Sequence, residues 1–357
     1  MSLVRELEIV GLRHEPNDLL VVDLETVEGD AWHFIQGQYL TLNLMIDGEE
    51  QRRSYSLCSA PQTGLQIGIK RVPGGTVSEY AHRHFQVGVR VESFAPAGNF
   101  YLPLQAGRAR RYLMLAAGSG ITPIIAHIRA ILRDEPRSQI TLLYGNRVST
   151  EIAFVDALQW LKNRYVSRLQ WFNVFSRQHC DNAAFAGRID AARLRLLDPL
   201  LDLRGKDAIF VCGPQGMSDE VATQVRALGM PPDVLRTERF FNSAEDAQEA
   251  LHKRAARAVD YADLDSRVRV RAQGREVAFD LAATGHSVLD GAIEAGLDLP
   301  FSCKGGVCAT CKARLLEGEV QMDVNHALDD DEVRRGYVLT CQAHPLSDGL
   351  LVDFDVS

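Results

Sequence analysis

Residues 300–312 read PFSCKGGVCATCK, and a further cysteine, Cys341, follows Cys311 after 30 positions. Cys303, Cys308 and Cys311 therefore stand in the order C-x4-C-x2-C. Four thiolates at this spacing are the ligand set of a plant-type [2Fe–2S] cluster. Zinc is the alternative, but zinc ribbons prefer paired CxxC units, and only Cys308 and Cys311 form one here. The spacing predicts an iron–sulfur cluster.

Two glycines, Gly305 and Gly306, lie between the first two of these cysteines. Without a Cβ, they let the backbone approach the inorganic sulfurs, and their amides can donate hydrogen bonds to the cluster. Four of the seven cysteines lie in the last fifth of the chain, which is typical of metal binding in a reducing compartment. We expect Cys58 and Cys180 to be ordinary packed residues.

A length of 357 residues favours two or three domains. The net charge of −8 argues against a nucleic-acid partner. Charged residues interrupt every apolar stretch near the N-terminus, and glycine, proline and charged residues interrupt the most apolar window, 112–132. We therefore predict a cytoplasmic protein without a membrane partner. Residues 266–357 hold 15 acidic against 9 basic residues, which fits docking to a basic protein face and fits a merely solvated surface equally well.

Hydrophobic periodicity divides the chain into four segments. Residues 1–106 alternate in period two, as in QYLTLNLMI (38–46), and predict an antiparallel β-barrel or sandwich with one helix near 77–84. Residues 107–241 alternate strand and helix, with helices expected at 122–133, 154–163 and 217–228, and predict a parallel sheet. Residues 242–265 are polar and predict a linker whose middle can form a short helix. Residues 266–357 predict an α+β domain with a hairpin and one helix at 287–296.

The cysteine segment, together with GYVLTCQAHPL (336–346) and LLVDFD (350–355), resembles the ferredoxin module of plant-type, ferredoxin-dependent reductases. The resemblance runs through all three globular segments. The chain is thereby identified as a member of the ferredoxin–NADP reductase family with a C-terminal [2Fe–2S] domain of β-grasp fold. The resemblance implies an FAD-binding barrel, an NAD(P)-binding α/β domain and a ferredoxin domain, with FAD, the cluster and NADPH or NADH as cofactors.

Arg53-Ser54-Tyr55-Ser56 matches the R-x-Y-[ST] motif of this family. The resemblance implies that Arg53 grips the FAD pyrophosphate, that Tyr55 covers the flavin ring, and that the Ser56 hydroxyl lies beside N5 as a catalytic group. Alternation puts Arg53 and Tyr55 on one face of a strand and both serines on the other. A bend at the end of the strand must be assumed if all three are to reach one cofactor.

A glycine turn followed by a helix start forms an anion site for the same pyrophosphate. We assign to it Gly75, Thr76, Val77 and Ser78, and we add Lys70 to the flavin site. Many relatives carry a basic residue at the position of Thr76, so one contact is expected to be weaker in this chain.

The stretch GSGITP (118–123) follows a predicted buried strand and opens a helix, with Thr122 expected as the N-cap and Pro123 at the first helical position. It is not the G-x-G-x-x-G fingerprint. In the family this turn receives the NAD(P)H pyrophosphate, which implies nucleotide-binding roles for Gly118, Thr122 and Pro123. The cysteine that ends the last apolar strand, Cys212, is expected beside nicotinamide C4 as a catalytic group, with Gly213 and Pro214 in the nucleotide site.

Three arginines, Arg147, Arg177 and Arg188, follow the next strands and suit the 2′-phosphate of NADPH, with NADH as the alternative. Each arginine alone is more often a solvated surface group. By resemblance, Glu238 is expected near the nicotinamide as a third catalytic group and Phe240 near the flavin.

The resemblance implies a reductase that passes electrons from NADPH through FAD to its own cluster and on to a separate oxygenase docking at the acidic ferredoxin domain. The partner it points to is a di-iron epoxidase of an aromatic acyl-CoA such as phenylacetyl-CoA, with a Rieske-type oxygenase or another cluster protein as the alternative. No HExxH, ExxH pair or haem motif marks an oxygen-activating site in this sequence. A non-catalytic redox sensor is the rival from another class, and it would need an output module that the sequence does not show.

Overall fold

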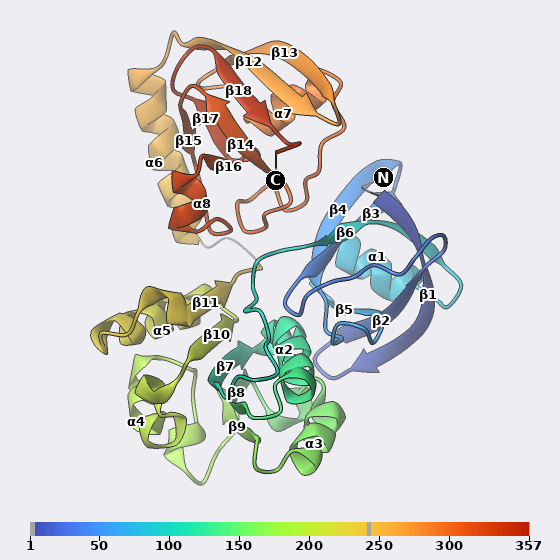
Figure 1. The fold of residues 1–357 in the computed structure, drawn as a ribbon, viewed down its shortest axis with the longest axis vertical. Coiled ribbons are helices and arrows are strands. Elements are labelled where there is room, and N and C mark those ends of the chain that lie inside the picture. Colours follow the sequence, from blue (N-terminus) through green and yellow to red (C-terminus); the bar gives the residue numbers. More distant parts are fainter. Residues whose placement is uncertain (1–3, 241–243, 357) are drawn as a thin grey trace. The chain divides into compact units, whose positions relative to one another are not determined.

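The computed structural model describes residues 4–240 and 244–356, and only the backbone of residues 244–247. The chain forms two compact units, Met1–Glu238 and Arg239–Ser357. The first unit contains an antiparallel barrel and a parallel sheet with helices, and the second contains a mixed sheet (Figure 1). These are the three architectures expected from the sequence. No helix in the described ranges is long and apolar enough to cross a membrane.

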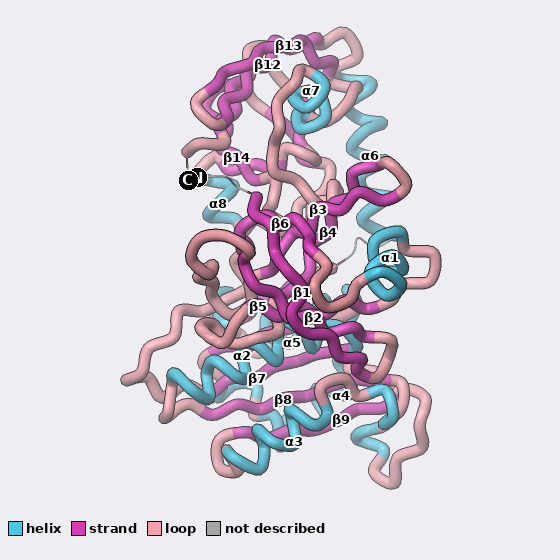
Figure 2. The backbone as a smooth tube through the Cα atoms, turned by 90° about the vertical axis from the view of Figure 1, so that its right-hand side faces the viewer, coloured by secondary structure: helices cyan, strands magenta, loops and turns pink. Residues whose placement is uncertain are grey.

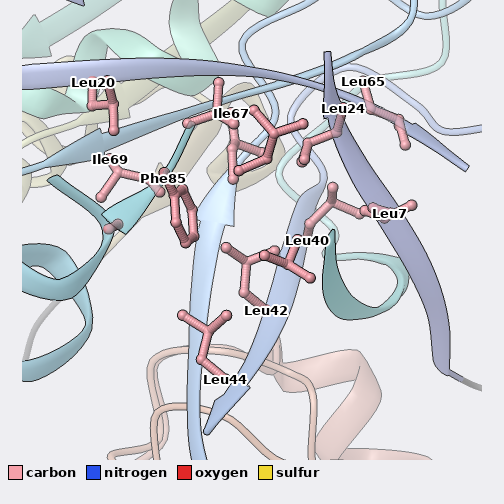
Figure 3. Close-up of a cluster of buried hydrophobic side chains, with 14 of the residues drawn as sticks. Leu7, Leu20, Leu24, Leu40, Leu42, Leu44, Leu65, Ile67, Ile69 and Phe85 are labelled. Atoms are coloured by element: carbon pink, nitrogen blue, oxygen red, sulfur yellow. The ribbon is translucent and has the colours of Figure 1, made fainter. Parts of the chain in front are cut away.

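Six antiparallel strands form the barrel in the order β4-β3-β6-β1-β2-β5. A bridge between Leu57 and Ile67 joins the two edges. Alternate side chains such as Leu40, Leu42 and Ile67 point into the interior, where Phe85 after the helix also packs (Figure 3). The period-two pattern therefore builds the core. The elements are β1 Val4–Glu15, β2 Leu19–Thr26, β3 Tyr39–Ile46, β4 Glu49–Ser56, β5 Leu65–Lys70, α1 Thr76–His84 and β6 Arg90–Ala97.

Five parallel strands follow in the order β11-β10-β7-β8-β9. Strands β7, β8 and β9 run side by side (Figure 2), and helices α2 and α3 lie on one face with α4 and α5 on the other (Figure 1). The predicted helices are all present. The elements are β7 Arg111–Ala117, α2 Ile121–Asp134, β8 Gln139–Asn146, α3 Val155–Arg164, β9 Leu169–Phe175, α4 Ala191–Leu201, β10 Ala208–Cys212, α5 Gln215–Ala227 and β11 Leu235–Glu238.

The start of α2 differs from the prediction. The helix begins at Ile121, because a 3-10 turn over Gly118–Gly120 runs directly into it, and Gly120 occupies the N-cap position. Thr122 is therefore not the cap. Its Oγ1 donates to the Ser119 carbonyl oxygen at 2.9 Å from inside the first turn. The prediction for Thr122 and Pro123 was wrong by two residues.

The second unit is built on a five-stranded mixed sheet in the order β13-β12-β18-β14-β16, with a separate pair β15-β17. The predicted hairpin is β12 with β13, and the predicted helix is α7. The elements are α6 Ala244–Asp260, β12 Asp265–Ala272, β13 Arg275–Ala282, α7 Val288–Glu294, β14 Lys312–Glu317, β15 Val320–Met322, α8 Asp330–Arg334, β16 Tyr337–Leu339, β17 Ala343–Pro345 and β18 Leu350–Asp353.

The segment predicted as a linker contains a 17-residue helix, α6, where only a short helix was expected. Arg257 attaches it to the second unit, with Nη1 donating to Asp323 Oδ1 at 2.8 Å and Nε donating to the Ala283 carbonyl at 2.9 Å. Both members of this ion pair are almost fully buried, at 2% and 3% side-chain exposure. Arg254 and His344 also reach the Asp323 carboxylate. The helix therefore belongs to the ferredoxin domain through charged contacts and not through an apolar stripe.

Candidate functional site

The four predicted cluster ligands form two pairs. The Cys308 thiol donates to the Cys303 sulfur at 3.1 Å, and Cys341 is hydrogen-bonded to Cys311. These bonds lower the pKa of Cys303 to about 5 and raise the pKa values of Cys308 and Cys341, which burial raises further. Two pairs suit a two-iron cluster, because each iron takes two terminal ligands. Within the described ranges, no three His, Cys, Asp or Glu side chains gather as they would around a single ion.

The loop around these thiols is shaped by Gly306, whose φ is +75°. A Cβ there would lie 2.5 Å from the Val324 carbonyl oxygen, and the His326 amide donates to the Gly306 carbonyl at 2.9 Å. The Gly305 amide donates to the Cys303 sulfur at 3.3 Å. Close backbone approach and an amide aimed at sulfur are what the two glycines were expected to provide. The donor set therefore fits a plant-type cluster.

The first flavin residues lie on β4, which pairs with β3 over Glu49–Ser56 without a register shift. Arg53 is exposed and donates to the Arg52 carbonyl at 3.2 Å, while Tyr55 is partly buried. Burial raises the pKa of Tyr55, and the Arg53 charge opposes the rise. Ser56 is buried at the end of the strand. Alternation continues through Ser56, so the assumed bend does not lie within the paired strand.

The start of α1 offers backbone amides more than side chains. Val77 is packed in the barrel core, and the Ser78 hydroxyl accepts a hydrogen bond from the Val72 amide at 3.1 Å. The first helical bond runs from the Glu79 amide to the Gly75 carbonyl, so the amides of residues 76–78 have no intrahelical acceptor. We correct the expectation accordingly: Val77 and Ser78 can reach a ligand only through backbone N–H groups. An exposed arginine and free helix amides fit a pyrophosphate.

Lys70 ends β5 on the side of the barrel that meets the parallel sheet. Burial lowers its pKa, and the nearby Arg147 guanidinium lowers it further. Lys70 thus lies beside a residue predicted for the nicotinamide nucleotide, and its contact with the flavin stays a prediction.

The nucleotide loop depends on close backbone approach at the carboxyl edge of the sheet. A Cβ on Gly120 would lie 2.0 Å from the Cys212 carbonyl oxygen, and one on Gly213 would lie 3.1 Å from the Ala117 Cβ. Gly118 has a φ of +55°. The ends of β7 and β10 are therefore pressed together where open α/β sheets bind ligands. Pro214 follows as the N-cap of α5.

Two buried polar side chains at this edge have no hydrogen-bond partner. They are Asn146, which ends β8, and Ser218, in the first turns of α5. Because buried polar groups are normally paired, both fit a bound nucleotide that would satisfy them. Sequence reasoning did not include either in the site, although Asn146 lies between Gly145 and Arg147, where the strand end alone was a sufficient signal.

The three predicted catalytic residues lie together. The Ser56 hydroxyl donates to Glu238 Oε2 at 3.4 Å, and Glu238 is the neighbour of Cys212 across β10 and β11. Although Glu238 keeps some exposed surface, desolvation of its carboxyl group raises its pKa to about 8. Burial also raises the pKa of Cys212 well above the ordinary value, and the charge of Glu238 adds to this. The barrel and the sheet thus supply one buried, uncharged constellation.

The three arginines lie along the carboxyl edge of β8 and β9. The Arg177 amide donates to the Arg147 carbonyl at 2.9 Å, and Arg188 follows a bridge between Phe175 and Ala186. The Arg147 guanidinium is already engaged by Glu151 at 2.7 Å. Arg177 and Arg188 are exposed. We therefore rely on these two for the 2′-phosphate and less on Arg147.

Phe240 is partly buried and belongs to the second unit, so its place beside the flavin stays a prediction. Cys58 is fully buried, as expected of a packed residue, whereas Cys180 is half-exposed in the loop after β9.

Models of three protein families match the chain. An oxidoreductase FAD-binding domain matches residues 16–101, an oxidoreductase NAD-binding domain matches 114–223, and a 2Fe-2S iron-sulfur cluster binding domain matches 270–346. Each match covers one of the architectures described above. The protein is therefore an oxidoreductase with FAD, NAD(P)H and a [2Fe–2S] cluster as cofactors.

Relatives narrow this class. The chain is 41% identical to the reductase of the 1,2-phenylacetyl-CoA epoxidase of Escherichia coli (strain K12) over 99% of both chains. It is 34% identical to the ferredoxin reductase component of 3-ketosteroid-9-alpha-monooxygenase of Mycobacterium tuberculosis, over 90% of this chain and 86% of the relative. The solved structure of phthalate dioxygenase reductase shares the fold, with a TM-score of 0.58, 24% identity and 98% coverage of each chain. The chain belongs to the ferredoxin–NADP reductase family with a C-terminal plant-type ferredoxin domain, whose members here are reductase components of oxygenases.

The cradle at Gly306 predicts that Gly306→Ala loses most of its cluster. A Cβ would clash with Val324, and alanine at this φ is strained by about 1–2 kcal/mol. Iron and acid-labile sulfide per protein, with the visible spectrum, measure the loss. Gly296→Ala is the matched control, because Gly296 also has a positive φ but open space around it. Equal cluster content in both variants would contradict the cradle.

The raised pKa of Glu238 predicts a pH-dependent stability. The folded protein keeps this proton up to about pH 8, whereas the unfolded chain releases it near the ordinary value of 4.5, so stability falls as pH rises between these values. Glu238→Gln should show a shallower fall in its thermal midpoint, followed by release of flavin fluorescence. Glu49→Gln, at the exposed start of β4, serves as control. Parallel slopes for wild type and Glu238→Gln would show that Glu238 titrates normally.

Proposed function

We propose that this chain is the reductase component of an epoxidase of an aromatic acyl-CoA, and that it passes electrons from NADPH to a separate oxygenase. The meeting of Ser56, Cys212 and Glu238 carries the proposal for its chemistry. The similarity to the reductase of phenylacetyl-CoA epoxidase supports the substrate class. When bound, the nicotinamide supplies a hydride, the flavin accepts both electrons, and the cluster passes them on singly.

Each catalytic residue has a physical role in this proposal. With a pKa of about 8, Glu238 keeps its proton at neutral pH and adds no charge where the hydride passes. The Cys212 thiol stays neutral for the same reason and lies against the nicotinamide. Ser56 holds the Glu238 carboxyl and presents its hydroxyl to the flavin. A buried, neutral lining excludes water from the transfer.

The remaining residues bind the cofactors. Arg53 and the amides at the start of α1 hold the FAD pyrophosphate, and Tyr55 covers the ring. The GSG turn and the buried Asn146 side chain receive the NADPH backbone. The four cysteines hold the cluster in the pairs described above.

We further propose that the oxygenase docks at the ferredoxin domain. This domain carries 15 acidic against 9 basic residues, and Cys303 is the partly exposed member of the four cysteines. A partner with a basic face would be attracted to such a surface and would approach the cluster from the Cys303 side. Seven free cysteines suit a reducing, cytoplasmic compartment.

A second candidate keeps the electron transfer and changes the partner. The 34% identity to the reductase component of 3-ketosteroid-9-alpha-monooxygenase favours an oxygenase that acts on a different substrate, a Rieske-type oxygenase being one possibility. The two candidates differ only in the protein that receives the electrons.

Reconstitution separates these partners. We expect NADPH-dependent epoxidation of phenylacetyl-CoA when the chain is mixed with the oxygenase component of the epoxidase. Cys311→Ser should abolish it while leaving flavin reduction intact, because the cluster is lost. Rapid ferricyanide reduction by NADPH without any epoxidation would reject the epoxidase assignment and favour another oxygenase.

The exposed arginines predict the nucleotide preference. The double substitution Arg177→Gln with Arg188→Gln should lower kcat/KM for NADPH by roughly tenfold, because about 1–3 kcal/mol of charge-assisted hydrogen bonding is lost. The value for NADH should stay unchanged. Arg195→Gln, an exposed arginine on α4, is the control. Equal losses with both nucleotides would show that these arginines do not read the 2′-phosphate.

A further inference from the structure

One strand of the barrel forms a seam with the nucleotide-binding half of the first unit. The odd residues of β5, Leu65, Ile67 and Ile69, are buried in the barrel core. Period two directs the even residues outward. These even residues meet the parallel-sheet half: Gln66 bonds Arg129, Gly68 lies against Thr122, and Lys70 lies beside Arg147.

Helix α2 lies along this seam. A Cβ on Gly68 would be 2.6 Å from the Thr122 methyl carbon, so the first turn of α2 packs directly on the strand backbone. Further along the helix, Arg129 Nη1 donates to the Cys58 carbonyl oxygen at 2.7 Å and to Gln66 Oε1 at 3.1 Å. One turn later, Arg133 donates to the Pro61 carbonyl oxygen at 2.6 Å.

Arg129 is an unusual anchor, because its hydrogen-bond acceptors are a carbonyl and an amide oxygen instead of a carboxylate. Burial lowers its pKa, and the nearby carboxylates of Glu15 and Asp23 only partly offset this. A guanidinium taken out of water for neutral acceptors is poorly compensated in stability. Its fork gives a fixed direction and distance between the two elements that it joins. Gln66 is itself held, with Nε2 donating to Asp23 Oδ1 at 2.6 Å.

The two elements joined by Arg129 carry the two sides of the reaction. Cys58 lies two residues after Ser56, which the proposed function puts at the flavin. Helix α2 begins with the turn that receives the nicotinamide nucleotide, and Gly120 in that turn touches the Cys212 carbonyl. Eight residues separate Ile121 from Arg129, a span of about 12 Å along the helix. Arg129 therefore touches neither cofactor site but ties both to one frame.

We propose that Arg129 is a positioning residue for hydride transfer, setting the approach of the nicotinamide side of the site to the flavin side through the Cys58 carbonyl. The inference rests on the proposed electron-transfer function. The step concerned breaks the C4–H bond of the reduced nicotinamide and moves the hydride, with both electrons, to flavin N5. A small displacement between donor and acceptor slows such a step far more than it weakens binding.

The test compares Arg129→Met with Arg133→Met in the full-length protein loaded with FAD and cluster. Stopped-flow absorbance gives the rate constant of flavin reduction at saturating NADPH, and fluorescence titration gives the dissociation constant of NADP⁺. Arg133 is the matched control, since it lies on the same helix, also donates to a barrel carbonyl, and has Asp134 as a second partner.

Arg129→Met should slow flavin reduction roughly tenfold and raise the primary deuterium isotope effect, with the NADP⁺ dissociation constant within about twofold of wild type. Arg133→Met should keep the wild-type rate. Arg129→Lys, which still reaches one acceptor, should recover part of it. Equal slowing in Arg129→Met and Arg133→Met, or an unchanged rate in Arg129→Met, would overturn the proposal.

If Arg129→Met fails to retain FAD, Arg129→Lys and Gln66→Ala carry the same test. Slower reduction with a full FAD complement supports the proposal, and wild-type rates in both variants overturn it. A wild-type protein whose flavin is reduced by neither NADPH nor NADH would contradict the proposed function itself.

Discussion

The contact between Gly120 and the Cys212 carbonyl is the constraint on which the first unit depends. A separation of 2.0 Å from a Cβ that is not there means that only glycine allows the ends of β7 and β10 to meet. Their meeting brings the turn before α2 against the cysteine that ends β10 and lines up β11 so that Glu238 lies beside that cysteine. Through α2, the same contact extends to the barrel, since the helix that starts at this turn lies along β5.

Two buried carboxyl groups in this protein show opposite electrostatics. Glu238 has a hydroxyl and a thiol as neighbours, so burial wins and its pKa rises to about 8. For Asp323, burial alone would also raise the pKa, but hydrogen bonds from His344 and Arg257 overcome this and lower it. The first group is a neutral part of the reaction face, whereas the second is a permanent anion that holds a helix.

Much of this was predictable from residues alone, where the signal is local. Alternation in 38–46 and 65–70 marks barrel strands because each residue's burial depends on its own position in the pleat. Cysteine spacing and the RSYS motif indicated the cofactors. Long-range contacts were not predictable. Helix α6 has no apolar stripe, and its attachment depends on Asp323, which is 66 residues away from Arg257. The same holds for Arg129, whose partner Cys58 lies in a different half of the unit.

The attachment of α6 bears on how this protein can be recombined. A module exchange that cuts after residue 265, where composition changes, would carry Asp323 and His344 into a new chain without Arg257. The excised piece would then expose the surface that the helix covers and leave a buried anion without its main cation, a loss worth about 3–5 kcal/mol. The natural unit of exchange therefore starts before Ala244, and a fusion partner should be joined ahead of this helix.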